Sequence, residues 1–144
     1  MIGGPVSAGA LLAPALVLVA MTFALLVWGG RMRFSAVGRG EVKMRDIALR
    51  EPNWPKRILQ IGNCFQNQLE LPVLFYVLVA FLLVTGEGDL VDLVLAWAFV
   101  AARIAHAAVF VTSNDVRKRG PIFVLGMGVL IAHWAWFAVG LYAF

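Results

Sequence analysis

The sequence predicts an all-α integral membrane protein, a bundle of four membrane-spanning helices. Of its 144 residues, 62% are hydrophobic and only 14% are charged, which is too little charge to cover the surface of a soluble domain. Four segments reach or approach the length of about 20 mostly apolar residues that a spanning helix needs. None of them alternates between apolar and polar residues as β-barrel strands do, so helices are the remaining way to satisfy the backbone in lipid.

The predicted helices occupy residues 8–28, 58–84, 90–112 and 121–144, within a single domain that covers residues 1–144. The first segment lacks the basic start of a signal peptide, and we expect it to remain as an uncleaved anchor. Gly29 and Gly30 are expected to end this helix. Pro14 and Pro72 fall inside predicted helices, where a bilayer tolerates them as local bends.

The connections between these helices differ sharply in charge, and this difference predicts the orientation of the chain. Residues 29–57 contain eight Lys or Arg against three acidic residues, residues 85–92 contain three acidic residues and no base, and residues 113–120 contain three bases against one Asp. Because cytoplasmic loops concentrate Lys and Arg, the first and third connections are expected in the cytoplasm and both termini on the non-cytoplasmic side. The same rule explains the net charge of +4 without a nucleic-acid partner. The Ala- and Val-rich chain without organelle signals suggests a bacterial inner membrane.

The second predicted helix carries an unusual line of polar side chains. Gln60, Asn63, Asn67 and Glu70 are spaced three, four and three residues apart, which places them on one face of a continuous helix. Such a stripe is costly against lipid, so we expect it to face the bundle interior or a subunit interface.

The third predicted helix offers a partner for this stripe. Arg103 and His106 interrupt an otherwise apolar helix and share one face. A charge inside a membrane needs a partner, so we expect Arg103 to approach Glu70. The residues alone leave two interpretations open: these groups lock the helices together, or they form a buried ligand site. A lone His beside an Arg is a poor ligand set, so no metal is expected. Cys64 and His133 are expected to be packing or interfacial residues.

Two motifs resemble those of a known family. Asn67, Glu70 and Pro72 match the Asn-x-x-Glu…Pro motif, and Arg103, His106 and the aromatic Phe110 resemble the Arg-x-x-His-x-x-x-Tyr motif, of the MAPEG family (membrane-associated proteins in eicosanoid and glutathione metabolism). The four spans, the long basic first connection and the chain length are also similar, so the resemblance covers nearly the whole chain.

The resemblance implies a homotrimer in contact with membrane lipids, with glutathione bound between subunits near the cytoplasmic side. Family enzymes activate the glutathione thiol and use it on lipophilic electrophiles, and Glu70 would meet the ammonium group of the γ-glutamyl moiety. By correspondence of position, the glutathione-binding residues would be Arg31, Asn63, Asn67, Glu70, Arg103 and His106.

The chain departs from the family pattern at four positions. Asn63 and Gln66 stand where family enzymes commonly carry arginines, Phe110 replaces the tyrosine, and Phe123 replaces the arginine that activates the thiol. Glutathione carries two carboxylates, so losing a charged hydrogen bond weakens binding by about 1–3 kcal/mol. No catalytic residue is assigned. Three hypotheses remain: a glutathione-dependent transferase or peroxidase, a non-catalytic relative that binds a lipid or another lipophilic molecule, and a structural membrane protein.

Overall fold

The computed structural model describes residues 6–48 and 52–142, and within these ranges every regular element is helical. The elements are α1 (Ala8–Gly38), the short 3-10 helix η1 (Met44–Ile47), α2 (Lys56–Asn67), α3 (Leu71–Thr85), α4 (Leu90–Val111) and α5 (Val116–Tyr142). With α2 and α3 taken as one span, four stretches are long and apolar enough to cross a membrane. The prediction of an all-α bundle with four spans is confirmed.

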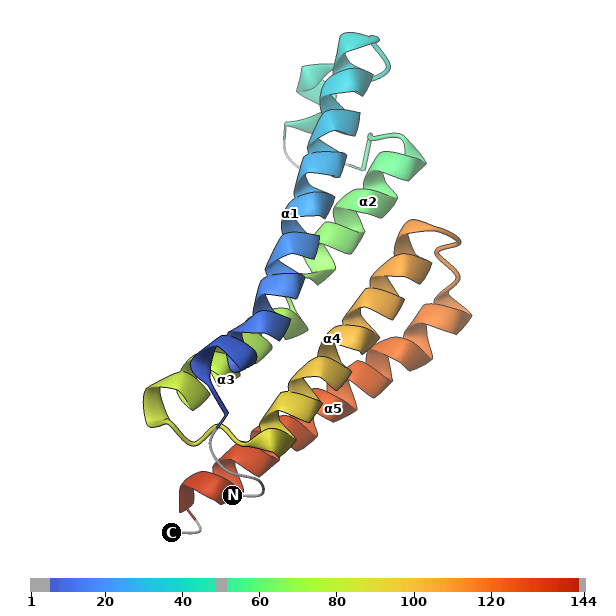
Figure 1. Ribbon diagram of the computed structural model, residues 1–144. Helices are drawn as coiled ribbons and strands as arrows, with labels where there is room; N and C mark the ends of the chain where they lie inside the picture. The colour runs from blue at the N-terminus through green and yellow to red at the C-terminus, as the bar shows by residue number, and fades with distance from the viewer. Residues whose placement is uncertain (1–5, 49–51, 143–144) are drawn as a thin grey trace.

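The helices form two antiparallel pairs that lie side by side (Figure 1). α1 packs against α3 with its first half and against α2 with its second half, while α4 packs along α5. The helices meet in a core of fully buried side chains that includes Leu18, Phe75, Leu78 and Phe99. α1 begins and α5 ends at one end of the bundle, and η1 and the turn from α4 to α5 lie at the other. Two spans, α2–α3 and α4, separate the first basic connection from the third, so both connections lie at the same end of the bundle.

The first helix extends ten residues beyond its predicted end, through Gly29 and Gly30 to Gly38. Gly29 is buried, and a Cβ built there would lie 3.5 Å from Ile61 of α2. A small residue at this position lets two helices approach closely. The prediction that Gly29 and Gly30 end the helix was wrong. Gly29 lies inside α1, where its small size lets α2 pack closely.

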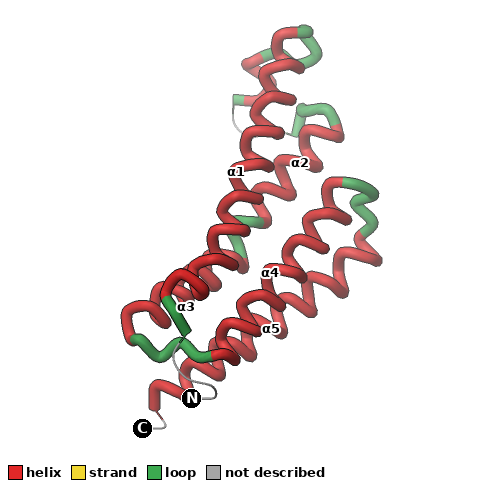
Figure 2. Tube along the Cα trace, viewed as in Figure 1, coloured by secondary structure: helices red, strands yellow, loops and turns green. Residues whose placement is uncertain are grey.

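The second predicted helix is broken into two. α2 ends at Asn67, α3 begins at Leu71, and a short non-helical segment separates them (Figure 2). Pro72 lies in the first turn of α3, where its missing N–H is tolerated, whereas in a continuous helix it would clash with the preceding turn. The predicted bend at Pro72 is therefore a complete interruption of the helix.

The fourth span also begins earlier than predicted. α5 starts at Val116, and Pro121 lies inside it. The N–H of Arg117 donates to the Asp115 carboxylate at 2.9 Å, which caps the new start. The predicted end at Phe144 lies outside the described residues.

Candidate functional site

The break between α2 and α3 is held by a buried arginine from α4. Arg103 is 1% exposed, and its Nη2 donates to the Asn67 carbonyl at 3.0 Å and to Asn67 Oδ1 at 2.7 Å. A longer contact of 3.3 Å reaches Gln68 Oε1. A helix end leaves carbonyls without partners, which is expensive in lipid. The guanidinium supplies a donor to one of these carbonyls and orients the Asn67 side chain.

Asn67 in turn connects this interior contact to Glu70. Its Nδ2 donates to Glu70 Oε2 at 2.6 Å. Among the residues that the structure describes, no ion pair joins Arg103 to Glu70. The predicted approach of the two charges therefore takes place through the amide of Asn67 rather than by direct contact. A neutral amide, which accepts from the cation and donates to the anion, therefore lies between the two charges.

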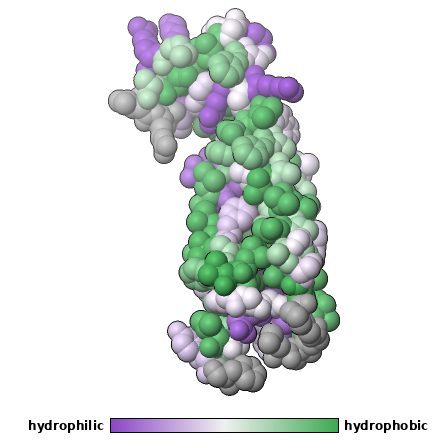
Figure 3. All heavy atoms as spheres, turned by 60° about the vertical axis from the view of Figure 1, so that its left-hand side comes forward, coloured by the Kyte–Doolittle hydropathy of each residue, from purple (hydrophilic) through white to green (hydrophobic). Residues whose placement is uncertain are grey.

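The predicted polar stripe divides into an inner and an outer part. Gln60 Nε2 donates to the Phe110 carbonyl at 2.7 Å, which ties α2 to the end of α4. Asn63 and Glu70 are instead exposed on the outside of the chain. The expectation of one continuous polar face was wrong, because the helix ends at Asn67 and Glu70 no longer follows its repeat. Figure 3 shows hydrophilic side chains concentrated around η1 and the start of α2, above a mostly apolar surface.

The residues predicted on the third span face the interior of the chain. His106 is 3% exposed and its ring lies 5.7 Å from the Phe110 ring and 5.6 Å from the Phe123 ring, between centroids. Arg103 Cζ lies 5.9 Å from the Phe123 centroid. Nε and Nη1 of Arg103 and Nδ1 of His106 are buried and have no hydrogen-bond partner within the described part of the chain. These polar atoms without a partner lie in the interior of the chain, close to the apolar rings of Phe110 and Phe123.

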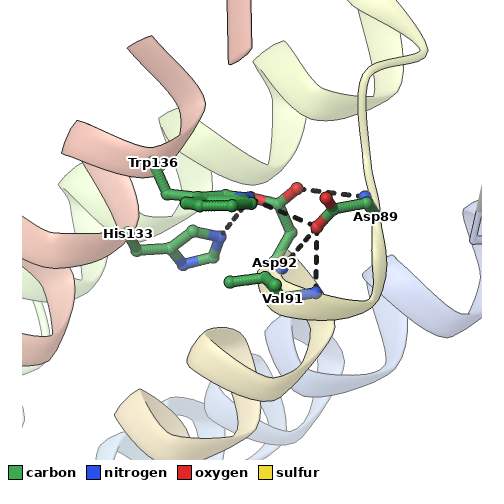
Figure 4. A network of polar contacts seen from close by, with 5 residues as sticks. All are labelled: Asp89, Val91, Asp92, His133 and Trp136. Carbon is green, nitrogen blue, oxygen red and sulfur yellow. Dashed lines mark hydrogen bonds and ion pairs between the residues drawn. The ribbon is translucent and has the colours of Figure 1, made fainter. Parts of the chain in front are cut away.

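A second polar network closes the opposite end of the bundle (Figure 4). Asp89 and Asp92 form a capping box at the start of α4. His133 Nε2 lies 3.1 Å from Asp92 Oδ1, and Trp136 Nε1 donates to Asp89 Oδ1 at 3.3 Å. Sequence reasoning gave His133 a packing or interfacial role and missed its carboxylate partner, 41 residues earlier in the chain. This network joins the start of α4 to α5.

Comparison with known proteins identifies the family. The chain matches the MAPEG family over residues 11–139 of 144. The protein belongs to the MAPEG family. No curated protein and no solved structure was found to match it. It is therefore an integral membrane protein, with lipid around its spans, of a family linked to glutathione and eicosanoid metabolism.

One expected MAPEG site residue lies apart from the others within the chain. Arg31 is exposed on α1 and lines a hollow of about 530 Å³ with Arg57, Ser35 and Glu41. The Arg39 guanidinium lowers the pKa of the Glu41 carboxyl in this region, mainly through a hydrogen bond of 2.6 Å. Arg31 therefore lines a different hollow from the one that Asn63 lines.

The structure of this MAPEG protein also gives a specific position to Arg33, which the sequence analysis used only to predict the orientation of the chain. Arg33 reaches from α1 to α2, where it lines a hollow of about 360 Å³ together with Asn63 and Gln66. The signal that could have found it is Gly62, the one residue without a side chain beside Asn63 on α2. Sequence alone could not show that this glycine faces the arginine.

Proposed function

We propose that this MAPEG protein binds glutathione between the subunits of a homotrimer and uses its thiol on lipophilic electrophiles, as a transferase or peroxidase. The observation that carries the proposal is Glu70, an exposed carboxylate midway along the 30-residue span Lys56–Thr85, held by Asn67. A carboxylate at that depth facing lipid costs about 2.5–3.5 kcal/mol on insertion scales. A neighbouring subunit would shield the Glu70 carboxylate from lipid, and a cationic group of the ligand would pair with its charge.

The ammonium group of glutathione is the ligand group that suits Glu70. One Glu70 oxygen accepts from Asn67 Nδ2, which fixes the carboxylate and leaves its other oxygen for the ligand. Arg103 keeps Asn67 in place from inside the chain. In a trimer, Arg31 of a neighbouring copy adds positive charge for a glutathione carboxylate. Asn67 and Glu70 thus contact the ligand, and Arg103 acts as a positioning residue.

The chemical step needs the thiol as a thiolate, because a thiol with a pKa of about 8.5 is mostly protonated at neutral pH. The proton leaves to solvent, and the anion needs a cation from a position other than 123, where this chain has Phe in place of the family's arginine. The thiolate sulfur then forms a bond to the electrophilic carbon while the leaving group departs with its electron pair. Binding inside the membrane gives lipophilic electrophiles direct access to the sulfur.

A second candidate function is supported by Phe110 and Phe123. Both rings pack against His106, so two apolar groups lie beside its buried imidazole. Apolar residues at these positions suit a non-catalytic MAPEG relative that binds a lipophilic molecule. Catalysis of glutathione transfer distinguishes the two functions.

The proposed setting is a bacterial inner membrane with both termini on the non-cytoplasmic side. The basic connections lie at one end of the bundle, which supports this orientation by the positive-inside rule. A reporter fused after the last residue is expected to be active only outside the cytoplasm, and a cytoplasmic signal would overturn the orientation.

The proposed function is tested by calorimetric titration of the purified protein with glutathione in neutral detergent. Wild type is expected to bind, and Glu70→Gln is expected to lose at least about tenfold in affinity, because it loses the charge that pairs with the ammonium group. Absence of binding at millimolar glutathione would overturn the proposal. Conjugation of 1-chloro-2,4-dinitrobenzene, in which sulfur displaces chloride, then separates an enzyme from a binding protein. Cross-linking that shows only monomers would overturn the homotrimer.

A further inference from the structure

A hollow between α1 and the start of α2 gathers basic side chains at the end of the bundle where both basic connections lie. It has a volume of about 530 Å³, and its polar lining consists of Arg31, Ser35, Arg39, Glu41 and Arg57. Glu41 is already paired with Arg39 at 2.6 Å. Within residues 6–48 and 52–142, no carboxylate pairs with Arg31 or Arg57. The hollow therefore presents two guanidinium groups that lack an anionic partner in this part of the chain.

Arg57 is held in place by groups that leave its charge uncompensated. Its Cζ lies 5.3 Å from the centroid of the Trp28 ring on α1, and its Nη1 donates to the Val111 carbonyl at the end of α4. A ring face and a carbonyl orient the guanidinium without neutralising it. Because a guanidinium carries more N–H donors than this single bond uses, Arg57 keeps donors for an anion.

The hollow lies at the depth of lipid headgroups. Residues 8–28 contain no charged residue, and at about 1.5 Å per residue they extend about 30 Å, the thickness of the hydrocarbon core of a bilayer. Trp28 ends this stretch, and indole rings are enriched at the membrane–water interface. Arg31 and Ser35 follow on the next turns of α1, which places them level with the phosphates of the lipids.

Apolar side chains accompany the basic ones. Met32, Pro55 and Ile58 line the hollow, and Trp28, which stacks on Arg57, is 38% exposed. The glycerol and upper acyl chains of a phospholipid can contact these groups, whereas a free phosphate ion cannot. Charge then selects among lipids, because two guanidinium groups attract an anionic headgroup and repel the ammonium of a zwitterionic one.

We propose that this hollow binds the headgroup of an anionic phospholipid, with Arg57 on the phosphate and Arg31 adding positive charge. Basic pockets at the cytoplasmic ends of membrane helices bind such headgroups by the same complementarity of charge. Arg57 is not among the residues assigned to glutathione. The inference therefore goes beyond the proposed function and is tested apart from it.

The test counts bound lipids by native mass spectrometry of the protein in neutral detergent, titrated with phosphatidylglycerol or with phosphatidylcholine of equal chain length. Wild type is expected to bind phosphatidylglycerol about 30-fold more tightly, because two basic residues near an anionic headgroup contribute about 1 kcal/mol each. Arg57→Gln is expected to lower this preference about fivefold, whereas Arg57→Lys keeps the charge and most of the preference. Arg117→Gln is the matched control, since it removes an exposed charge at the same end of the bundle but outside the hollow.

The preference is a ratio within one protein, so it does not depend on how much of a variant is folded. Equal binding of the two lipids by wild type would overturn the inference, and so would a full preference in Arg57→Gln. An equal loss in Arg117→Gln would assign the preference to general surface charge and not to the hollow. Millimolar inorganic phosphate is expected to leave the lipid bound, and displacement would show that the hollow takes a free phosphate ion instead. Glutathione titration of Arg57→Gln is expected to match wild type, so either proposal can fail without the other.

Discussion

The contact between Arg103 Nη2 and Asn67 Oδ1 predicts a measurable coupling between α4 and the break in the second span. Asn67→Leu removes the acceptor and leaves a buried guanidinium with fewer partners. Arg103→Met removes the charge together with its need for a partner. Because breaking one side of a buried polar pair costs more than replacing both sides, Arg103→Met should destabilise much less in the Asn67→Leu background than alone.

The size of this coupling follows from the geometry. A hydrogen bond to a charged group contributes about 1.5–3 kcal/mol in soluble proteins, whereas pairs inside a membrane average about 0.6 and reach about 1.7 kcal/mol. The 2.7 Å contact of a guanidinium that is 1% exposed belongs at the upper end of the membrane range. We expect a coupling of about 1.5 kcal/mol. The remaining Arg103 contacts to the Asn67 carbonyl and to Gln68 persist in Asn67→Leu and limit its loss.

The assay is unfolding by dodecyl sulfate in mixed micelles, followed by circular dichroism for wild type, both single variants and the double variant. Protein concentration is held constant, since subunit association contributes to apparent stability. Asn67→Leu combined with His133→Phe, at the opposite end of the bundle, serves as the control pair and should be additive. Additivity of Asn67→Leu and Arg103→Met within about 0.5 kcal/mol would refute the role given to this contact.

Three further predictions concern packing and the second polar network. Asp92→Ala removes the partner of His133 and half of the capping box, so unfolding free energy should fall by about 2–3 kcal/mol in the same assay; an unchanged midpoint would contradict a stabilising role. Gly126→Leu overpacks the contact with Ala102, whose Cβ lies 3.4 Å from a Cβ built on the glycine, and should cost about 1–3 kcal/mol, whereas Gly126→Ala should stay near wild type. Cys64 is fully buried, so maleimide labelling should begin only when dodecyl sulfate unfolds the chain, and rapid labelling of the folded protein would contradict its packing role.

Much of the architecture could be predicted because it depends on local composition. Runs of apolar residues are sufficient to identify spans, and the four spans appear in the structure. The boundaries of the spans were less predictable, because a glycine can either end a helix or lie inside one where a neighbouring helix packs closely. Gly29 does the second, and only the position of Ile61 decides between the two.

The candidate site was predictable in its residues but not in their arrangement. The spacing from Asn63 to Glu70 implied one helical face, yet α2 ends at Asn67 and a new helix begins at Leu71, so Glu70 does not continue that face. Arg103 was expected to meet Glu70, and the structure places Asn67 between them. A charge inside a membrane requires some partner, and that requirement alone does not select one among several nearby acceptors.

By itself, the sequence determined that this chain spans a membrane four times as helices and carries polar groups in its second and third spans. These properties follow from the cost of exposing backbone and charge to lipid, which acts on each segment separately. Only the tertiary structure decided which polar groups turn inward to hold the break, which face outward, and that Arg33 lies over Gly62. Those outcomes depend on distances between residues that are far apart in the chain. Close packing of the helices fixes these distances, whereas the pattern of residues within one segment does not.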